Sequence, residues 1–235
     1  MKTYASLKQI KVKELKFIIR EGTSDFKAIK EVVIDGSYQR RTFSPEAGEQ
    51  WIDIGANCGA FSVWSASLGA NVIAFEPDPD NASMAEINAQ LNGFAKKIKT
   101  IHSGATEGDS NLSVMLHRNT ANGNLWRNSI YKKWQGGESV KVNLVPIGQF
   151  WNKDNCIKLD AEGVEMPILE KYAKTRVKKL VFEWSFDIDS SLSRFESVIL
   201  TLKTIYANVV YSSYSAGYTH WQKSWFPACR TIFCY

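Results

Sequence analysis

Short apolar runs alternate with amphipathic stretches from residue 50 onward. Runs typical of buried strands lie at 50–54, 71–75, 98–102, 156–160 and 179–184. Two further segments alternate in the manner of half-buried strands, 111–117 and 139–145. Apolar residues recur near helical spacing in four intervening segments: 61–68, 81–91, 164–172 and 195–202. Strands that alternate with helices predict an α/β fold, with a mostly parallel twisted sheet and helices on both faces.

The N-terminal part has a different pattern. Residues 15–20 predict a strand and 21–25 a turn, and a short apolar helix face follows that Ser24 or Asp25 can cap. No internal repeat or low-complexity linker interrupts the chain. We therefore expect a small N-terminal extension over 1–49, with one strand and one short helix, before a single domain over 50–235.

Composition narrows the class of protein. The 235 residues are 44% hydrophobic and 23% charged, which is typical of soluble globular chains and excludes disordered or low-complexity proteins. No run of about 18 apolar residues is present and the start lacks a secretory signal, so we expect a cytoplasmic protein without a membrane span. Four cysteines without a C-x-x-C pair and three scattered histidines predict reduced thiols and no structural zinc.

The net charge of +5 does not demand an anionic partner. Lysines cluster at positions 8–16 and again, with an arginine, at 171–179. Such clusters are mostly solvated faces, and a phosphate-binding patch is the alternative interpretation.

Candidate chemistry begins at the loop after the first strand of the predicted sheet. In such sheets ligands bind beyond the carboxyl ends of the strands. This loop is Asp-Ile-Gly-Ala-Asn-Cys-Gly, residues 53–59, and its two glycines permit close backbone approach. It lacks the G-x-G-x-x-G pattern of pyrophosphate loops, and its leading acid suits a cationic ammonium group better. A glycine turn after a strand is also a common structural feature.

Glu76 ends the next strand. A carboxylate there can accept hydrogen bonds from both hydroxyls of a ribose. Alternatively, Glu76 opens a turn with Pro77 and caps the following helix. Together, the glycine loop and this acid indicate an adenosine-bearing ligand.

Three motifs in order resemble the signatures of FkbM-type methyltransferases. They are residues 53–59, residues 75–79 (Phe-Glu-Pro-Asp-Pro) and residues 157–165 (Ile-Lys-Leu-Asp-Ala-Glu-Gly-Val-Glu). The resemblance runs from about residue 20 to residue 184 and leaves the aromatic C-terminal segment outside. It implies a Rossmann-like methyltransferase fold that uses S-adenosylmethionine, commonly on hydroxyl oxygens of sugars or natural products.

The resemblance also implies which residues bind the cofactor. The amino-acid end would be surrounded by Asp53, Gly55, Ala56, Asn57 and Gly59. Glu76, beside Pro77, would hold the ribose. The adenine would contact Ser103, Gly104 and Ala105, an assignment by position. Asp25 would help to shape the same site, and a helix cap explains this residue equally well.

The third motif bears on the reaction. Side chains alternate along a strand, so Lys158 and Asp160 should share one side, with Glu162 just beyond. Methyl transfer from a sulfonium is an in-line displacement in which positioning matters, and a carboxylate can remove the hydroxyl proton. We expect Asp160 or Glu162 as the base and Lys158 as the group that fixes the carboxylate charge. A structural salt-bridge network is the alternative, and Glu183 is a second-rank candidate.

Other candidates carry less chemistry. His102 ends a strand and Cys58 lies in the glycine loop, but both are more typical of structural positions. The long loop 119–137 is expected to cover the acceptor site. Aromatic residues crowd 206–235; most are expected in the core, and Trp221 and Trp225 are the candidates for acceptor contact.

The sequence therefore predicts an S-adenosylmethionine-dependent O-methyltransferase acting on a hydroxyl of a sugar, glycan or natural product. A nucleic-acid methyltransferase of the ribose 2'-O type is one alternative, and a non-catalytic S-adenosylmethionine-binding module is another. No metal site is predicted.

Overall fold

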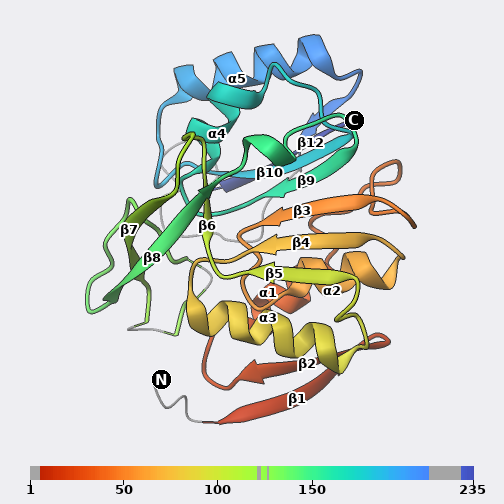
Figure 1. Ribbon diagram of the computed structural model, residues 1–235, viewed down its shortest axis with the longest axis vertical. Helices are drawn as coiled ribbons and strands as arrows, with labels where there is room; N and C mark the ends of the chain where they lie inside the picture. Colours follow the sequence, from red (N-terminus) through yellow and green to blue (C-terminus); the bar gives the residue numbers. More distant parts are fainter. Residues whose placement is uncertain (1–5, 121–122, 126, 212–228) are drawn as a thin grey trace.

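A seven-stranded sheet forms the centre of the protein (Figure 1). The computed structural model describes residues 6–120, 123–125, 127–211 and 229–235. The strand order is β11-β12-β10-β9-β3-β4-β5. Its strands are β3 (Gln50–Ile54), β4 (Asn71–Phe75), β5 (Ile98–Ile101), β9 (Asn155–Leu159), β10 (Lys179–Ser185), β11 (Val209–Tyr211) and β12 (Cys229–Cys234). β12 pairs antiparallel with both β10 and β11, whereas β10, β9, β3, β4 and β5 pair in parallel, so the predicted mostly parallel sheet is confirmed for these five strands.

Helices cover both faces of this sheet, because its buried strands point apolar side chains in both directions. Trp51 belongs to the core shared with α2 (Ala60–Ser67) and α3 (Pro79–Leu91). The next residue, Ile52, belongs to the core shared with α4 (Glu165–Tyr172) and α5 (Leu192–Ile205). All four helices overlap the segments in which the sequence predicted them.

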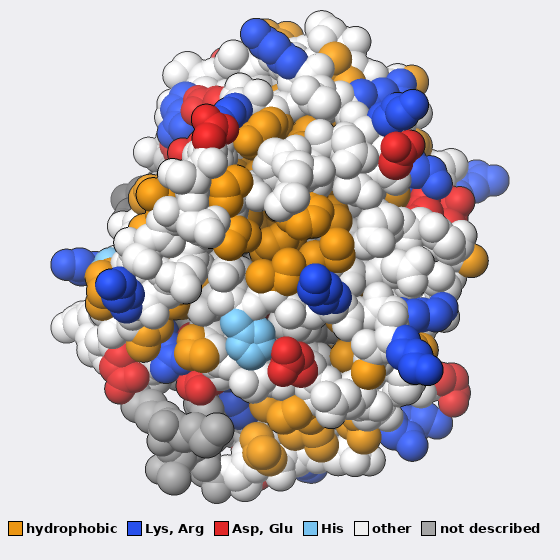
Figure 2. All heavy atoms as spheres, in the orientation of Figure 1, with side chains coloured by type: hydrophobic (Ala, Val, Ile, Leu, Met, Phe, Trp, Pro, Cys, Tyr) orange, Lys and Arg blue, Asp and Glu red, His pale blue; other side chains and the backbone are white. Residues whose placement is uncertain are grey.

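A second, three-stranded sheet is inserted between β5 and β9. It consists of β6 (Gly104–Thr106), β7 (Leu112–Arg118) and β8 (Glu138–Pro146) in the order β6-β8-β7, and the short η2 (Gly148–Phe150) follows. The alternating patterns predicted β7 and β8, whereas β6 is too short to show one. Figure 2 shows hydrophobic side chains gathered in the middle of this view. The part-buried side chains of Ile73, Ile101 and Val145 pack against the core that contains Ile52.

The N-terminal extension is a hairpin followed by a helix. β1 (Leu7–Val12) pairs antiparallel with β2 (Leu15–Arg20), and α1 (Asp25–Ile29) continues into the π-helical η1 (Lys30–Ile34). The sequence predicted β2 but missed β1, whose residues are mostly exposed and therefore show no apolar run. The lysines at 8, 11, 13 and 16 are all exposed.

Asn88 in α3 and Asn92, the residue that ends this helix, hold the hairpin against α3. The Asn88 side chain accepts from the backbone N–H of Ile18 at 2.7 Å and donates to its carbonyl at 3.3 Å. Asn92 accepts from the Lys16 N–H at 2.9 Å and donates to its carbonyl at 2.6 Å. The two side-chain amides thus form hydrogen bonds with backbone groups along the edge of β2, much as a neighbouring strand would.

Asp25 is not a helix cap. Its carboxylate accepts from the Arg20 guanidinium at 2.9 and 2.7 Å and from the Arg20 N–H at 2.9 Å, with both side chains buried. The capping position belongs to Ser24, which makes no side-chain capping hydrogen bond. A buried arginine requires a charged partner, and this requirement accounts for the acid.

Two expectations from composition concern thiols and membranes. Cys58, Cys156 and Cys234 are buried free thiols, as predicted. Within the described part of the chain, the longest apolar stretches in helices fall short of what a bilayer span requires.

Candidate active site

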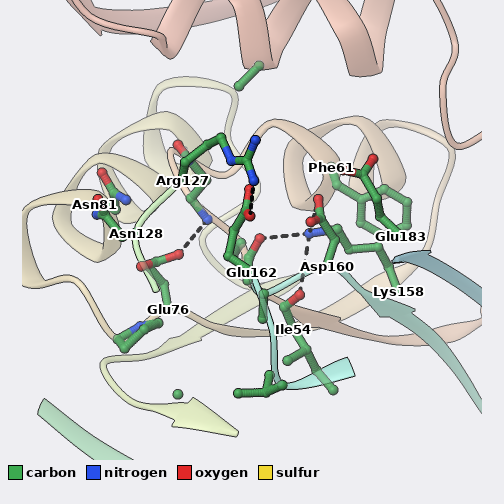
Figure 3. A pocket seen from close by; sticks show the side chains of 18 of the residues that line it. Ile54, Phe61, Glu76, Asn81, Arg127, Asn128, Lys158, Asp160, Glu162 and Glu183 are labelled. Carbon is green, nitrogen blue, oxygen red and sulfur yellow. Dashed lines mark hydrogen bonds and ion pairs between the residues drawn. The ribbon is translucent and has the colours of Figure 1, made fainter. Parts of the chain in front are cut away.

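A cavity of about 260 Å³ opens at the carboxyl ends of β3, β4 and β9. β4 and β5 continue the sheet from one edge of β3, whereas β9 and β10 continue it from the other edge. The order of the strands therefore reverses at β3. Figure 3 shows Glu76 and two asparagines at one end of the cavity, with Asp160, Lys158 and Glu183 at the other. This is the position at which open α/β sheets bind ligands.

The glycine loop forms the floor of the cavity. Gly55 has a φ of +81°, and a Cβ there would lie 1.9 Å from the carbonyl oxygen of Asp160. Gly59 has a φ of +83°, and its Cβ would lie 2.9 Å from the Cα of Ala85 in α3. The loop therefore needs glycine at both positions. Gly55, Ala56 and Asn57 line the cavity, whereas Gly59 allows α2 and α3 to approach each other.

Glu76 faces the cavity and also fixes the loop. Its Oε2 accepts from the Asn57 N–H at 2.7 Å, and its Oε1 accepts from the Asp78 N–H at 2.9 Å. Burial raises the pKa of Glu76 to about 7, and the nearby charge of Asp78 adds to the effect. Each carboxylate oxygen can accept a further hydrogen bond. The helix cap of α3 is Asp78, which accepts from the N–H groups of Asp80 and Asn81, so Glu76 does not fill that role.

Asp53 lies beneath the cavity rather than in its wall. It is fully buried, accepts from the Ser62 hydroxyl at 2.7 Å, and lies 3.1 Å from the Lys158 ammonium. That ammonium donates to the Gly55 carbonyl at 2.7 Å. Burial is the largest single influence and lowers the pKa of Lys158, but Asp53, Asp160 and Glu76 together outweigh it and raise the pKa above its ordinary value. Asp53 therefore pairs with the lysine that holds the glycine loop, and its expected contact with the cofactor stays a prediction.

Asp160 projects from the end of β9 into the cavity, as predicted for its position. Its Oδ2 accepts from the Tyr38 hydroxyl at 2.6 Å and lies 3.7 Å from the Lys158 ammonium. Among the residues that the structure describes, none forms a hydrogen bond with Oδ1 of Asp160. Lys158 thus fixes a carboxylate charge here, and the salt-bridge and catalytic interpretations of this motif are compatible.

Glu162 is the second carboxylate of the third motif in the cavity wall. It has a φ of +52°, and its Oε2 lies 3.3 Å from Arg127 Nη2. Burial raises the pKa of Glu162 to about 8, although Arg127 opposes the shift. Glu165, by contrast, does not line the cavity and accepts from the N–H groups of Ala161 and Gly163 at 2.6 and 2.7 Å. It holds the loop that presents Asp160 and Glu162.

The predicted adenine contacts divide into two groups. Gly104 and Ala105 line the cavity beside Pro77, and a Cβ on Gly104 would lie 2.5 Å from the Leu144 side chain. Ser103 is buried and does not line the cavity. Asp25 also lies outside it, because its carboxylate is committed to Arg20.

Sequence analysis missed two polar wall residues from the N-terminal extension, Glu31 and Tyr38. Burial raises the pKa of Glu31 to about 7, and the charge of Asp160 adds to the effect. Helical spacing predicted an apolar face of Phe26, Ile29 and Val32, of which Ile29 and Val32 are buried but Phe26 is exposed. It gave no sign that the π-helical turn presents Glu31 to the cavity, and Tyr38 lies beyond any periodic pattern.

The predicted covering loop does contribute to the wall. Between β7 and β8, the described wall residues are Asn124, Leu125, Arg127, Asn128 and Ile130. Trp221 and Trp225, predicted as acceptor contacts, lie outside the described residues. His102 is exposed, with its Nε2 2.8 Å from Glu86, and burial raises the pKa of Cys58. In the described ranges, no group of three or more metal-ligating side chains gathers.

The methyltransferase FkbM domain matches residues 53–213, and a search of curated proteins found no match. A Pyrococcus abyssi tRNA (uracil-54, C5)-methyltransferase, solved with S-adenosyl-L-homocysteine, superposes with a TM-score of 0.51 at 12% identity. This superposition covers 97% of this chain but only 43% of that chain. An S-adenosylmethionine-dependent O-methyltransferase of Thermotoga maritima gives 0.45 at 12% identity, over 96% and 76% of the two chains.

The first superposition shows a shared fold, and the family match spans more than half of the chain. The motifs that carry the match form the cavity at the switch in strand order. The chain belongs to the FkbM methyltransferase family.

Proposed function

We propose that the protein methylates a hydroxyl oxygen of a sugar, glycan or natural product. One observation carries this proposal: a single cavity joins Glu76 and the glycine loop to the carboxylates of Asp160 and Glu162. The first pair suits a ribose and its attached amino-acid chain. The second pair supplies groups that can accept a proton from a hydroxyl.

The wall fits the cofactor at three points. Glu76 has acceptor capacity left on both oxygens for a ribose diol, and the floor at Gly55 has no room for a side chain. Beyond Glu76, Gly104 and Ala105 together with Leu116 and Leu144 form an apolar part of the wall suited to a flat base. When bound, S-adenosylmethionine supplies a methyl group on a sulfonium, which is electrophilic without further activation.

The residues of the chain then orient the acceptor and take its proton. Tyr38 and Lys158 hold Oδ2 of Asp160, which leaves Oδ1 to accept a hydrogen bond from the hydroxyl. Glu162 offers a second acceptor, and its pKa of about 8 makes it a stronger base than an ordinary carboxylate once it is ionised.

The charge of the wall favours an uncharged acceptor over nucleic acid. Among the described residues, the wall carries five carboxyl groups and two cations. Of the cations, Lys158 is buried against Asp53, and Arg127 is paired with Asp187 and Glu162. Nucleic-acid binding draws its affinity from Lys and Arg that contact phosphates. An acidic wall opposes such a backbone.

Transfer of an isotopically labelled methyl group tests the proposal. The parent would be incubated with labelled S-adenosylmethionine and either a panel of neutral methyl glycosides or ribose oligonucleotides, each at low and high salt. We expect product from the glycosides that varies little with salt. Salt-sensitive methylation of the oligonucleotides alone would replace the proposal with the nucleic-acid alternative. Tight cofactor binding without transfer to any probe would favour a non-catalytic module.

A pair of variants identifies the cavity as the site of transfer. Asp160→Asn removes a carboxylate from the wall. Glu49→Gln removes a buried carboxylate at the opposite end of β3, where it accepts from Trp51 and pairs with Lys179. We expect Asp160→Asn to lose transfer and Glu49→Gln to keep it.

A further inference from the structure

The N-terminal extension lies outside the matched family region, which begins at residue 53, yet it forms part of the cavity. Glu31 and Tyr38 line the wall together with Ala28 and Val32. The extension is fixed in place by several contacts, including a hydrogen bond of 2.8 Å from Arg20 to the Asn81 side chain, which also lines the wall. The extension is therefore rigidly attached to the site.

Tyr38 makes the most specific of these contacts. Its ring is buried and packs edge-on against Phe61, with 5.5 Å between centroids. Its hydroxyl donates to Asp160 Oδ2 at 2.6 Å. Burial raises the pKa of Tyr38 well above its ordinary value, and the charges of Asp160 and Glu183 add to this. The phenol therefore remains protonated and remains a donor across the pH range of an enzyme assay.

The hydrogen bond constrains the orientation of the Asp160 carboxylate. The terminal torsion of an aspartate is broad, so packing alone does not set the plane of the carboxylate. Lys158 Nζ lies 3.7 Å from Oδ2, a distance that gives attraction but little direction. The hydrogen bond from the Tyr38 hydroxyl, at 2.6 Å, is therefore the contact that gives this carboxylate a direction.

We propose that Tyr38 is a positioning residue for methyl transfer: by donating to Oδ2 of Asp160, it turns Oδ1 toward the acceptor hydroxyl. The inference builds on the proposed function, since it assumes an acceptor with a hydroxyl group. It makes the N-terminal extension a working part of the active site. Tyr38 acts through Asp160 and takes no proton itself.

Tyr38→Phe tests the proposal, because it keeps the ring against Phe61 and removes only the hydroxyl. Tyr206→Phe is the matched control. Tyr206 is also buried, and its hydroxyl binds the backbone of Val177 at 3.0 and 3.2 Å, away from the cavity wall. Both variants lose a buried phenolic hydrogen bond, so a general loss of stability affects both.

The kinetic measurement uses labelled S-adenosylmethionine and whichever neutral methyl glycoside the parent methylates. We expect Tyr38→Phe to lower kcat by about 10- to 100-fold, the range typical of misplaced catalytic groups. Cofactor affinity should stay within about twofold in calorimetric titration, since no bond to the cofactor end changes. Tyr206→Phe should keep the parent kcat. An unchanged kcat in Tyr38→Phe, or an equal loss in both variants, would overturn the proposal.

Proton NMR provides a readout that needs no acceptor. A short phenol-to-carboxylate hydrogen bond shielded from water gives a downfield, slowly exchanging proton signal. We expect this signal in the parent and in Tyr206→Phe, and we expect it to be absent from Tyr38→Phe and displaced in Asp160→Asn. Its absence from the parent would overturn the role of Tyr38 even if methyl transfer occurs. Its presence in a parent that methylates no probe would overturn the proposed function while confirming the Tyr38–Asp160 contact.

Discussion

Arg127 Nη2 lies 3.3 Å from Glu162 Oε2 and donates to both carboxylate oxygens of Asp187 at 2.7 Å. One guanidinium thus connects the loop between β7 and β8 to the loops that follow β9 and β10. Lys132 adds a bond of 2.8 Å to Asp187 from the same loop. The relationship matters for chemistry, because the cation opposes the rise in the pKa of Glu162 that burial causes.

Replacing Arg127 should change the pH dependence of methyl transfer. In Arg127→Ala, Glu162 loses its nearest cation while it stays buried, so its pKa should rise further above the parent value of about 8. If Glu162 is the base, the rise of kcat with pH should then move to higher pH. Arg194→Ala, which removes pairs with Glu170 and Asp189 instead, should leave the profile of the parent unchanged. If Arg127→Ala and the parent gave the same pH profile, the ionisation of Glu162 would not control the rate of methyl transfer.

Two further variants distinguish the candidate bases. A carboxyl group must be ionised to take a proton, so a base with a pKa of about 8 gives a rate that falls as pH decreases through that value. If Glu162 is the base, Glu162→Gln should abolish this limb of the profile along with most of kcat. If Asp160 is the base, Glu162→Gln should retain substantial turnover, whereas Asp160→Asn should not. A pH–rate series on the parent and both variants decides between them.

Glu76→Gln should weaken cofactor binding. The amide keeps the size of the side chain but replaces a charged acceptor with a group that has one donor end. We expect a loss of about 10- to 100-fold in affinity, which corresponds to a charge-assisted hydrogen bond. Calorimetric titration with S-adenosylmethionine and S-adenosylhomocysteine measures it. Glu49→Gln should bind both ligands as tightly as the parent does, even if its unfolding temperature falls.

The same carboxyl predicts a pH dependence of cofactor binding. Burial raises the pKa of Glu76 to about 7, so the ionised form is complete only above that pH. Because ribose hydroxyls donate to the ionised form, affinity should be highest at alkaline pH and fall as pH decreases through 7. The dependence should be reduced in Glu76→Gln. An affinity that rises toward acidic pH in the parent would contradict the assigned role.

Gly55→Ala should disrupt the site and the fold together. The new Cβ would lie 1.9 Å from the Asp160 carbonyl oxygen, so β3 and β9 must separate at the cavity. Gly93→Ala has a comparable φ of +74° with no atom within 4 Å of the new Cβ, so it reports backbone strain alone. We expect Gly93→Ala to cost about 1 kcal/mol of unfolding free energy and to keep cofactor binding. Gly55→Ala should cost more and lose binding, as urea unfolding and calorimetry would show.

Lys158 should be essential for stability because it neutralises Asp53. Lys158→Met leaves a buried carboxylate without its cation, which typically costs about 3–5 kcal/mol. The double variant Asp53→Asn with Lys158→Met removes both charges and should recover much of this loss. Equal stabilities of the single and double variants in urea unfolding would show that the pair is not energetically coupled.

The local pattern of the chain predicted most of the elements and the sites of chemistry. Apolar runs identified β3, β4, β5, β9 and β10, because a strand buried on both faces is mostly apolar, even though β3 carries Asp53 and β9 carries Lys158. The order of the three motifs indicated where the cofactor binds. Motif residues Gly55, Asn57, Glu76 and Asp160 do line one cavity. Their roles there remain predictions.

Contacts between segments distant in sequence could not be predicted in this way. Tyr38 and Asp160 are 122 positions apart, and Arg127 and Asp187 are 60 positions apart. Periodicity shows which face of an element is buried, but not which other element covers it. The partners of Asp25 and Asp53 could not be predicted for the same reason. The sequence shows that a position is acidic, but not whether its carboxylate contacts a ligand or a buried cation.

By itself, the sequence determined the family, the α/β alternation and the carboxylates available for chemistry, because these depend on residue type and local spacing. Only the tertiary structure decided which acids face the cavity and which are neutralised beneath it. It also brought the N-terminal extension to the site, through hydrogen bonds between the Asn88 side chain of α3 and the backbone of β2 and through the Tyr38 hydroxyl that donates to Asp160. The physical reason is that desolvation and pairing of charges are set by neighbours in space, and folding brings these neighbours together from separate parts of the chain.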